Sequence, residues 1–200
     1  MRFFVTKKNT REKIKEATYE LLSTKGYAQI SMRDIAKKAQ TAVGQLTYYY
    51  GTKEHLIGSV FDEMVNSFMQ ELNKCVEKST DKLKSITNFF EDLYKNENDV
   101  FKVLIDFTAQ ALWNNNFKDK IDKFFDETIS TVASAYMECG YDEDLANYKA
   151  SSFMANISGT AIQKVLYHKK DAIDNIKNFE NKISEKERKI FNVKKADGLL

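Results

Sequence analysis

The sequence predicts an all-α protein, with a small three-helix head at the N-terminus followed by a larger helical bundle. The 200 residues include no proline and only seven glycines, so the residues that most often interrupt a helix are scarce. Apolar residues also recur at helical spacing along most of the chain. Hydrophobic residues make up 42% of the sequence without forming a long apolar run, which favours a globular protein over a disordered or membrane-spanning one.

The first three predicted helices form the head. The first spans Thr10–Thr24, where apolar residues share one face, and it ends before Gly26, a usual helix stop. The second begins after Ser31, whose side chain suits an N-cap, and runs to about Ala39. A short turn leads to the third, Ala42–Tyr49. This spacing is typical of a helix-turn-helix, which places its last helix in the major groove of DNA.

Six longer helices are expected after the head, which makes about nine in total. Polar or glycine-containing breaks separate them, such as the three asparagines at 114–116 and Gly140. We therefore expect residues 1–52 to form the head and residues 53–200 to form a second domain. The six ranges are His55–Val76, Asp81–Lys95, Val100–Trp113, Phe117–Glu138, Asp142–His168 and Ala172–Phe191.

Positive charge is concentrated in the predicted head. Residues 1–56 contain eleven Lys/Arg and five Asp/Glu, a net charge of +6, whereas the rest of the chain has a net charge of −4. A basic segment of this kind favours binding to a polyanion such as double-stranded DNA, although an ordinary solvated surface can have the same excess.

Two segments of the head carry a pattern that resembles the tetracycline-repressor (TetR) family. Segment 31–39 reads Ser-Met-Arg-Asp-Ile-Ala-Lys-Lys-Ala, and segment 44–56 reads Gly-Gln-Leu-Thr-Tyr-Tyr-Tyr-Gly-Thr-Lys-Glu-His-Leu. The family typically has Thr/Ser-x-x-x-Ile-Ala, then Gly-x-Leu-Tyr-x-Tyr/His-Phe-x-x-Lys-x-x-Leu. The resemblance covers about residues 10–56, a quarter of the chain. It implies a homodimeric transcriptional regulator, commonly a repressor, that a small-molecule effector releases from a palindromic DNA operator.

Four residues are candidates for contacts to DNA phosphates. Hydroxyls, a helix N-terminus and an ammonium group are what a sugar-phosphate backbone accepts. The resemblance implies the same positions, which are Ser31, Tyr48, Tyr49 and Lys53. Tyr49 has an alternative, because a tyrosine at this place could instead pack under the head.

Five residues are candidates for contacts to base edges, namely Arg33, Val43, Gly44, Gln45 and Thr47. A glutamine can pair with adenine through two hydrogen bonds, and a threonine can offer its methyl group to thymine. Gly44 would let the third helix approach DNA closely, or it would serve only as a small packing residue.

The head departs from the family pattern at three places. Gln40 stands where the turn usually has glycine, so the backbone there has either a different turn or a strained positive φ. Ala42 stands where Ser or Thr usually caps the third helix, which leaves Thr41 as the expected cap. Thr47 replaces the usual aromatic residue. An alternative reading is therefore a helical interaction protein whose drifted head no longer binds DNA tightly.

The second domain carries no matched motif, so its expected roles come from the resemblance and from composition. The last two long helices suit a dimer interface, with Phe153, Ala155, Gly159 and Ile162 as its candidates. An intramolecular packing face explains the same residues equally well. Aromatic residues of the middle helices could line an apolar effector pocket, and the face of an aromatic ring also attracts cations. The pocket candidates are Phe89, Phe90, Tyr94, Phe107, Trp113, Phe125 and Tyr136.

No pattern for catalysis, a metal or a cofactor is found in the sequence. Its two histidines, His55 and His168, have no metal-ligand spacing, and neither cysteine has a nearby base. Cys75 and Cys139 are far apart, which predicts free thiols rather than a disulfide or a zinc site. We therefore expect a regulator without enzyme activity, and the absence of a signal peptide at the start predicts the cytoplasm.

Overall fold

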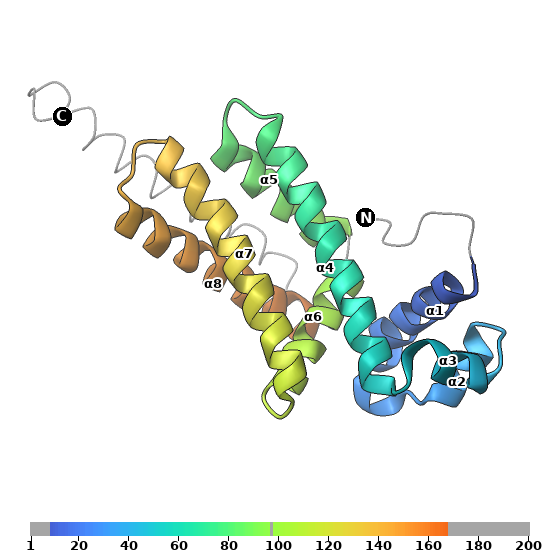
Figure 1. The fold of residues 1–200 in the computed structure, drawn as a ribbon. Helices are drawn as coiled ribbons and strands as arrows, with labels where there is room; N and C mark the ends of the chain where they lie inside the picture. Colours follow the sequence, from blue (N-terminus) through green and yellow to red (C-terminus); the bar gives the residue numbers. More distant parts are fainter. Residues whose placement is uncertain (1–8, 97, 168–200) are drawn as a thin grey trace, which may run out of the picture.

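Helices build both parts of the molecule, a head and a bundle (Figure 1). The computed structural model describes residues 9–96 and 98–167. Within these two ranges the chain forms eight α-helices and one short 3-10 helix, without a β-strand. The prediction of an all-α fold is confirmed. The ninth predicted helix, Ala172–Phe191, lies outside the described residues.

The head contains the first three α-helices. Reciprocal capping begins two of them, since the Asn9 side chain accepts a hydrogen bond from the Glu12 backbone N–H, and Ser31 accepts one from that of Asp34. These caps satisfy backbone donors that a helix start leaves free, so the sequence fixes where each helix begins. The elements are α1 (Thr10–Lys25), η1 (Tyr27–Gln29), α2 (Met32–Lys38) and α3 (Val43–Tyr50).

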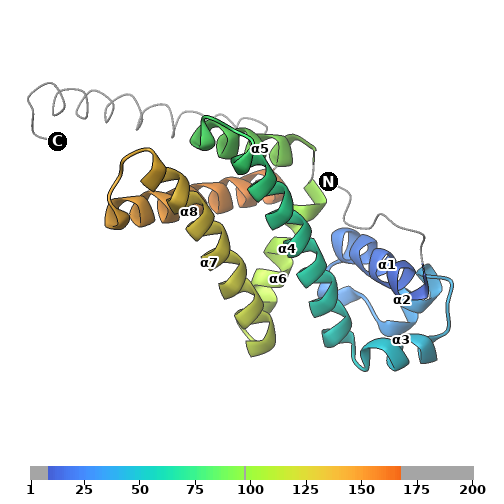
Figure 2. The ribbon, with the colours of Figure 1, turned by 45° about the horizontal axis from the view of Figure 1, so that its top comes forward.

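The bundle begins with α4, which runs from the head along the other long helices in both views (Figures 1 and 2). Thr52 caps its start by accepting a hydrogen bond from the His55 backbone N–H at 3.2 Å. α7 and α8 share the largest contact between two helices in the described chain. The bundle helices are α4 (Lys53–Glu77), α5 (Lys82–Asn96), α6 (Asn98–Ala111), α7 (Asn115–Glu138) and α8 (Glu143–Tyr167).

One continuous apolar core joins the head to the bundle. In the head, Ile14, Ile35 and Leu46 are fully buried and fix the crossing of α1, α2 and α3. In the bundle, the rings of Phe61 and Phe107 stack with their centroids 3.8 Å apart, which ties α4 to α6. α1 contacts both α4 and α6, so the head is packed directly against the bundle. Within the described residues, no helix is long and apolar enough to cross a membrane.

Candidate nucleic-acid interface and inner cavity

Helix α3 presents most of its surface to solvent. Leu46 is the one buried residue of this helix in the described chain, and it anchors α3 to the core of the head. The predicted base-contact residues Val43, Gln45 and Thr47 are all exposed, as is Arg33 in α2. A helix held by one apolar residue with its polar face outward has the form of a recognition helix.

Gly44 lies on the exposed side of α3. Apart from the neighbouring residues and the nearby backbone of α3 itself, no atom of the described chain lies within 4 Å of the position that a Cβ atom would take there. Packing inside the head therefore does not require a glycine at this position. The remaining sequence-based explanation is a close approach of DNA to the helix.

The predicted phosphate contacts differ in how freely their side chains project. Tyr48 is 84% exposed. Tyr49 is half-buried, packs against the core, and has the Arg11 guanidinium 5.2 Å from its ring centroid. The Ser31 hydroxyl donates a hydrogen bond to the Asp34 carboxylate at 2.5 Å, so it already has a partner within the protein. Hydrogen bonds from Ser31, with nearby lysines, hold the pKa of the Asp34 carboxyl below its ordinary value.

Lys53 is turned inward rather than toward solvent. Its ammonium group donates a hydrogen bond to the Tyr27 backbone carbonyl at 2.7 Å and lies 4.1 Å from the centroid of the Tyr27 ring. Burial lowers the pKa of Lys53, while the carboxylates of Asp106 and Glu54 act in the opposite direction. The sequence pattern at Lys53 predicts a phosphate contact, and it gives no sign of this attachment to the protein itself.

The turn between α2 and α3 is irregular, as the sequence suggests. Gln40 has a φ of 53°, and it is the one non-glycine residue with positive φ in the described chain. The N-cap of α3 is Ala42, whose side chain makes no capping hydrogen bond. The Thr41 hydroxyl instead donates to the Gln45 side-chain oxygen, so the expectation that Thr41 caps this helix is wrong. The start of α3 therefore lacks the stabilisation that a capping side chain gives.

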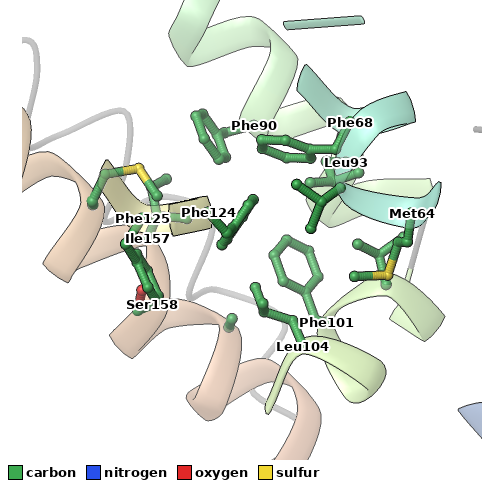
Figure 3. A pocket seen from close by; sticks show the side chains of 14 residues that line it. Met64, Phe68, Phe90, Leu93, Phe101, Leu104, Phe124, Phe125, Ile157 and Ser158 are labelled. Carbon is green, nitrogen blue, oxygen red and sulfur yellow. The ribbon is translucent and has the colours of Figure 1, made fainter. Parts of the chain in front are cut away.

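An apolar cavity lies at the centre of the bundle, where the side chains of five helices converge (Figure 3). Its volume is about 30 Å³, close to the space of one water molecule. Ser158 provides the one polar side chain among the lining residues, and no charged side chain lines this cavity. The lining consists of Met64, Val65, Phe68, Phe90, Leu93, Val100, Phe101, Leu104, Phe124, Phe125, Met154, Ile157, Ser158 and Ala161.

Two of the predicted pocket residues, Phe90 and Phe125, line this cavity. The other five do not, because helical spacing shows which residues are apolar but not which of them meet. Trp113 is 88% exposed at the end of α6. Phe107 packs between Phe61 and Phe117, Tyr136 packs against Tyr141, and Phe89 packs against Phe68.

Tyr94 is fully buried and has a structural partner of its own. Its hydroxyl donates a hydrogen bond to the Ile157 backbone carbonyl at 2.5 Å, and burial raises its pKa. This bond joins α5 to α8. The Tyr94 hydroxyl already has a partner within the protein and is consequently not free to orient a ligand.

Helix α8 has a buried face and an exposed face. Phe153, a predicted dimer residue, is 2% exposed and packs against Phe90 at 5.4 Å between ring centroids, so it faces the core and is not available to a partner chain. Ala155 and Ile162 are exposed, and Gly159 is partly exposed. With Leu145, Tyr148 and Leu166, they recur at intervals of three, four or seven residues, which place them along one side of α8.

The described residues contain no group of three or more His, Cys, Asp or Glu side chains placed to hold a metal ion. The cysteines Cys75 and Cys139 are both free thiols. Three features of the described chain are candidate functional sites: the exposed face of α3, the inner cavity and the exposed face of α8. Sequence reasoning missed most cavity residues, and it also missed Tyr27 and Asp106, which hold the head against α6.

Comparisons with known proteins match the start of the chain in sequence. Residues 14–60 match the family model described as "Bacterial regulatory proteins, tetR family". An uncharacterised HTH-type transcriptional regulator of Lactococcus lactis is 31% identical over 88 residues, which are 44% of this chain and 45% of that protein. The HTH-type transcriptional repressor KstR of Rhodococcus jostii is 42% identical over 52 residues, which are 26% of this chain and 24% of the repressor.

The sequence matches cover less than half of these curated relatives, whereas the fold matches along nearly the whole chain. A TetR transcriptional regulator from Legionella pneumophila has a TM-score of 0.80 at 19% identity, covering 90% of this chain and 99% of that one. The start of the chain is therefore similar to these regulators in sequence, and the rest of the chain is similar to them in fold. Residues 14–60 are thus similar to the tetR family of bacterial regulatory proteins, and the chain as a whole has the fold of a solved TetR regulator.

Proposed function

We propose that the protein is a sequence-specific DNA-binding transcriptional regulator, which acts as a repressor until a small apolar effector binds its bundle. The observation that carries this proposal is the exposed polar face of α3, held on the head by the single buried residue Leu46. The family match of residues 14–60 falls on the same segment. Repression is supported by KstR, a named repressor that resembles the head.

The proposed DNA contacts combine α3 with its surroundings. Arg33, Val43, Gly44, Gln45 and Thr47 would face base edges, because they are exposed at or beside α3. Tyr48 would contact a phosphate without rearrangement, since its side chain projects freely. Ser31 and Tyr49 would first have to exchange an internal contact for a phosphate, whereas the Lys53 ammonium has further N–H donors for a phosphate while it keeps its bond to the Tyr27 carbonyl. With the boundary between the two domains drawn between residues 52 and 53, every proposed DNA-contact residue except Lys53 lies in the head.

Two heads would act together through a homodimer formed on the exposed face of α8. The apolar residues Leu145, Tyr148, Ile162 and Leu166 are between 39% and 70% exposed, and they share one side of the helix with the small residues Ala155 and Gly159. Small residues at the middle of this face allow a second helix to approach closely. A two-fold dimer then reaches two half-sites of a palindrome in successive major grooves.

The effector would be a small apolar molecule because the cavity lining is almost entirely apolar. At about 30 Å³ the cavity is far smaller than a ligand site of several hundred Å³. An effector must therefore push apart the side chains of the wall before it fits. It would bind best to the expanded state, and this difference in affinity is what lets it shift the head away from DNA.

DNA binding is tested with labelled duplexes from the region upstream of the protein's own gene, at stated salt concentrations. The purified protein should shift a palindromic fragment, and Gln45→Ala should relax the preference at one base while total binding changes little. Gln70→Ala, at an exposed position of α4, is the matched control. If the protein shifts none of these fragments, the interaction protein with a drifted head is the better reading.

The dimer and the effector need separate tests. Ile162→Glu places a charge in the proposed interface and should convert dimers to monomers in sedimentation, whereas Ser134→Glu on α7 should not. For the effector, decanol, decanoic acid and decylamine share one chain and differ in head-group charge. Decanol should raise the melting temperature most, since no charged side chain lines the cavity among the described residues. Equal shifts with all three would contradict an uncharged site.

A further inference from the structure

The link between α1 and η1 is held against α6 by one carboxylate. Gly26 has a φ of 77°, and a Cβ atom added there would lie 3.3 Å from Oδ2 of Asp106. This positive φ lets the chain turn so that the Tyr27 backbone N–H donates a hydrogen bond to the same oxygen at 2.6 Å. Asp106 in α6 thus reaches from the bundle into the head, 79 residues away along the chain.

Lys53 binds the backbone carbonyl of Tyr27, the residue whose N–H group is bound by Asp106. The Tyr27 carbonyl accepts the hydrogen bond from the Lys53 ammonium, and the ammonium also lies against the Tyr27 ring. Asp106 and Lys53 therefore act on the N–H and the C=O of one residue, and the Asp106 carboxylate favours the charged form of Lys53. A chain of contacts joins α6, the end of α1 and the start of α4.

The cavity wall and Asp106 share helix α6, and the nearest wall residue, Leu104, is two positions from Asp106. Leu104 and Phe101 of α6 line the inner cavity. Phe107, the next residue after Asp106, stacks on Phe61 and packs against Phe117 at 4.4 Å between ring centroids. Phe117 in turn contacts the Tyr27 ring edge-on at 5.6 Å. An effector that pushes Leu104 outward would have to move this packed group with it.

We propose that Asp106 is a positioning residue for DNA binding, which through Tyr27 holds Lys53 and the start of α4 in the arrangement that fits DNA. This inference rests on the proposed function. With the cavity collapsed, Asp106 keeps the Tyr27 contact and the head is fixed against α6. With the cavity expanded, α6 carries Asp106 away from Tyr27, and Lys53 is released from its place.

The sign of the effect makes the proposal testable. Asp106→Ala removes a negative charge, and a general electrostatic effect alone would strengthen binding to DNA. The proposal predicts the opposite, with affinity for a bound duplex about tenfold weaker, the scale expected for loss of a charged hydrogen bond. Asp99→Ala is the matched control, because Asp99 is also on α6 but pairs with Lys102 on the same helix.

A double-mutant cycle shows whether Asp106 acts through Lys53. In the Lys53→Ala background, Asp106→Ala should cause little further loss of affinity, since its effect has already been removed. Both single variants should lower the slope of log affinity against log salt by about one. If the two losses multiply, or if Asp106→Ala matches Asp99→Ala, the positioning role is wrong.

Amide hydrogen exchange supplies a readout that needs no DNA. Exchange of the Tyr27 amide should become about tenfold faster in Asp106→Ala and stay unchanged in Asp99→Ala. Asp106→Asn keeps an acceptor oxygen, so it should retain Tyr27 protection and give an intermediate loss of DNA affinity. If circular dichroism shows that Asp106→Ala is unfolded, Asp106→Asn replaces it in the double-mutant cycle. The proposal then requires that the losses of DNA affinity from Asp106→Asn and Lys53→Ala are not additive.

The outcomes separate this inference from the function on which it rests. If the wild-type protein binds no duplex, the proposed function fails, and the exchange data still report whether Asp106 holds Tyr27. If the wild type binds DNA while Asp106→Ala binds equally well or more tightly, Asp106 does not position the head, although the regulator function stands.

Discussion

The head and the bundle direct their functional side chains in opposite ways. In the head, α3 turns most of its side chains outward, and Leu46 is its one buried residue in the described chain. In the bundle, five helices turn apolar side chains inward around a cavity of about 30 Å³. The exposed residues of a single helix can be substituted without disturbing the fold. The wall residues of a cavity shared by five helices cannot be substituted so freely, because each of them is also a core residue.

Phe90→Ala should have the largest effect on stability. Phe90 is 1% exposed, and its ring contacts those of Phe68 and Phe153 in the cavity wall. Removing the ring should lower the free energy of unfolding by about 3–5 kcal/mol, measured by denaturant unfolding. Phe125→Ala is the comparison, since Phe125 lines the same cavity but is only partly buried. Equal losses for both variants would show that the wall does not behave as core.

Leu46→Ala should break the head while leaving the bundle assembled. Leu46 is fully buried, so the substitution should cost about 2–5 kcal/mol and detach α3. We expect loss of DNA binding together with an unchanged sedimentation coefficient for the dimer. Thr47→Ala, at the adjacent exposed position, should leave the unfolding curve nearly unchanged. If Leu46→Ala also dissociated the dimer, the stability of the bundle would depend on the packing of the head.

Gln40→Gly should stabilise the turn before α3. A φ of 53° is unfavourable for glutamine and acceptable for glycine, so the gain should be about 1 kcal/mol in thermal unfolding. Gln40→Ala keeps the Cβ atom and should give no such gain. Ala42→Ser would supply the missing cap, worth about 1 kcal/mol, provided that the serine hydroxyl reaches the free backbone N–H groups of α3.

The smallest expected effect concerns pH and the start of α2. Hydrogen bonds from Ser31 lower the pKa of Asp34 from its ordinary value of 3.8, so the ionised form is favoured in the folded head. Its stabilising contribution is present above that ordinary value and is lost as the pH falls through the lower, folded value. The difference in melting temperature between the wild type and Asp34→Asn should therefore shrink as the pH is lowered from about 5 to about 3. A constant difference would mean that the charge of Asp34 plays no part.

The positions of the helices could be predicted from the sequence because their signals are local. Capping residues such as Ser31 and stops such as Gly26 act on neighbouring backbone groups, and the predicted bounds agree with the described helices to within a few residues. The strained turn at Gln40 was also foreseeable, since a missing glycine is visible in the sequence. The outcome at Thr41 was not foreseeable, because its hydroxyl donates to the Gln45 side-chain oxygen and does not accept from a backbone N–H group of α3.

The sequence by itself determined the fold class, the family resemblance and the residues that α3 exposes, since each of these follows from residues close together in the chain. Only the tertiary structure decided which aromatic side chains meet at the cavity, that Phe153 faces inward, and that Lys53 and Asp106 hold Tyr27 between them. Periodicity identifies the apolar side of each helix, but it does not give the rotation of that helix or how closely it packs against the other four helices of the bundle. Those depend on how all the side chains pack at once.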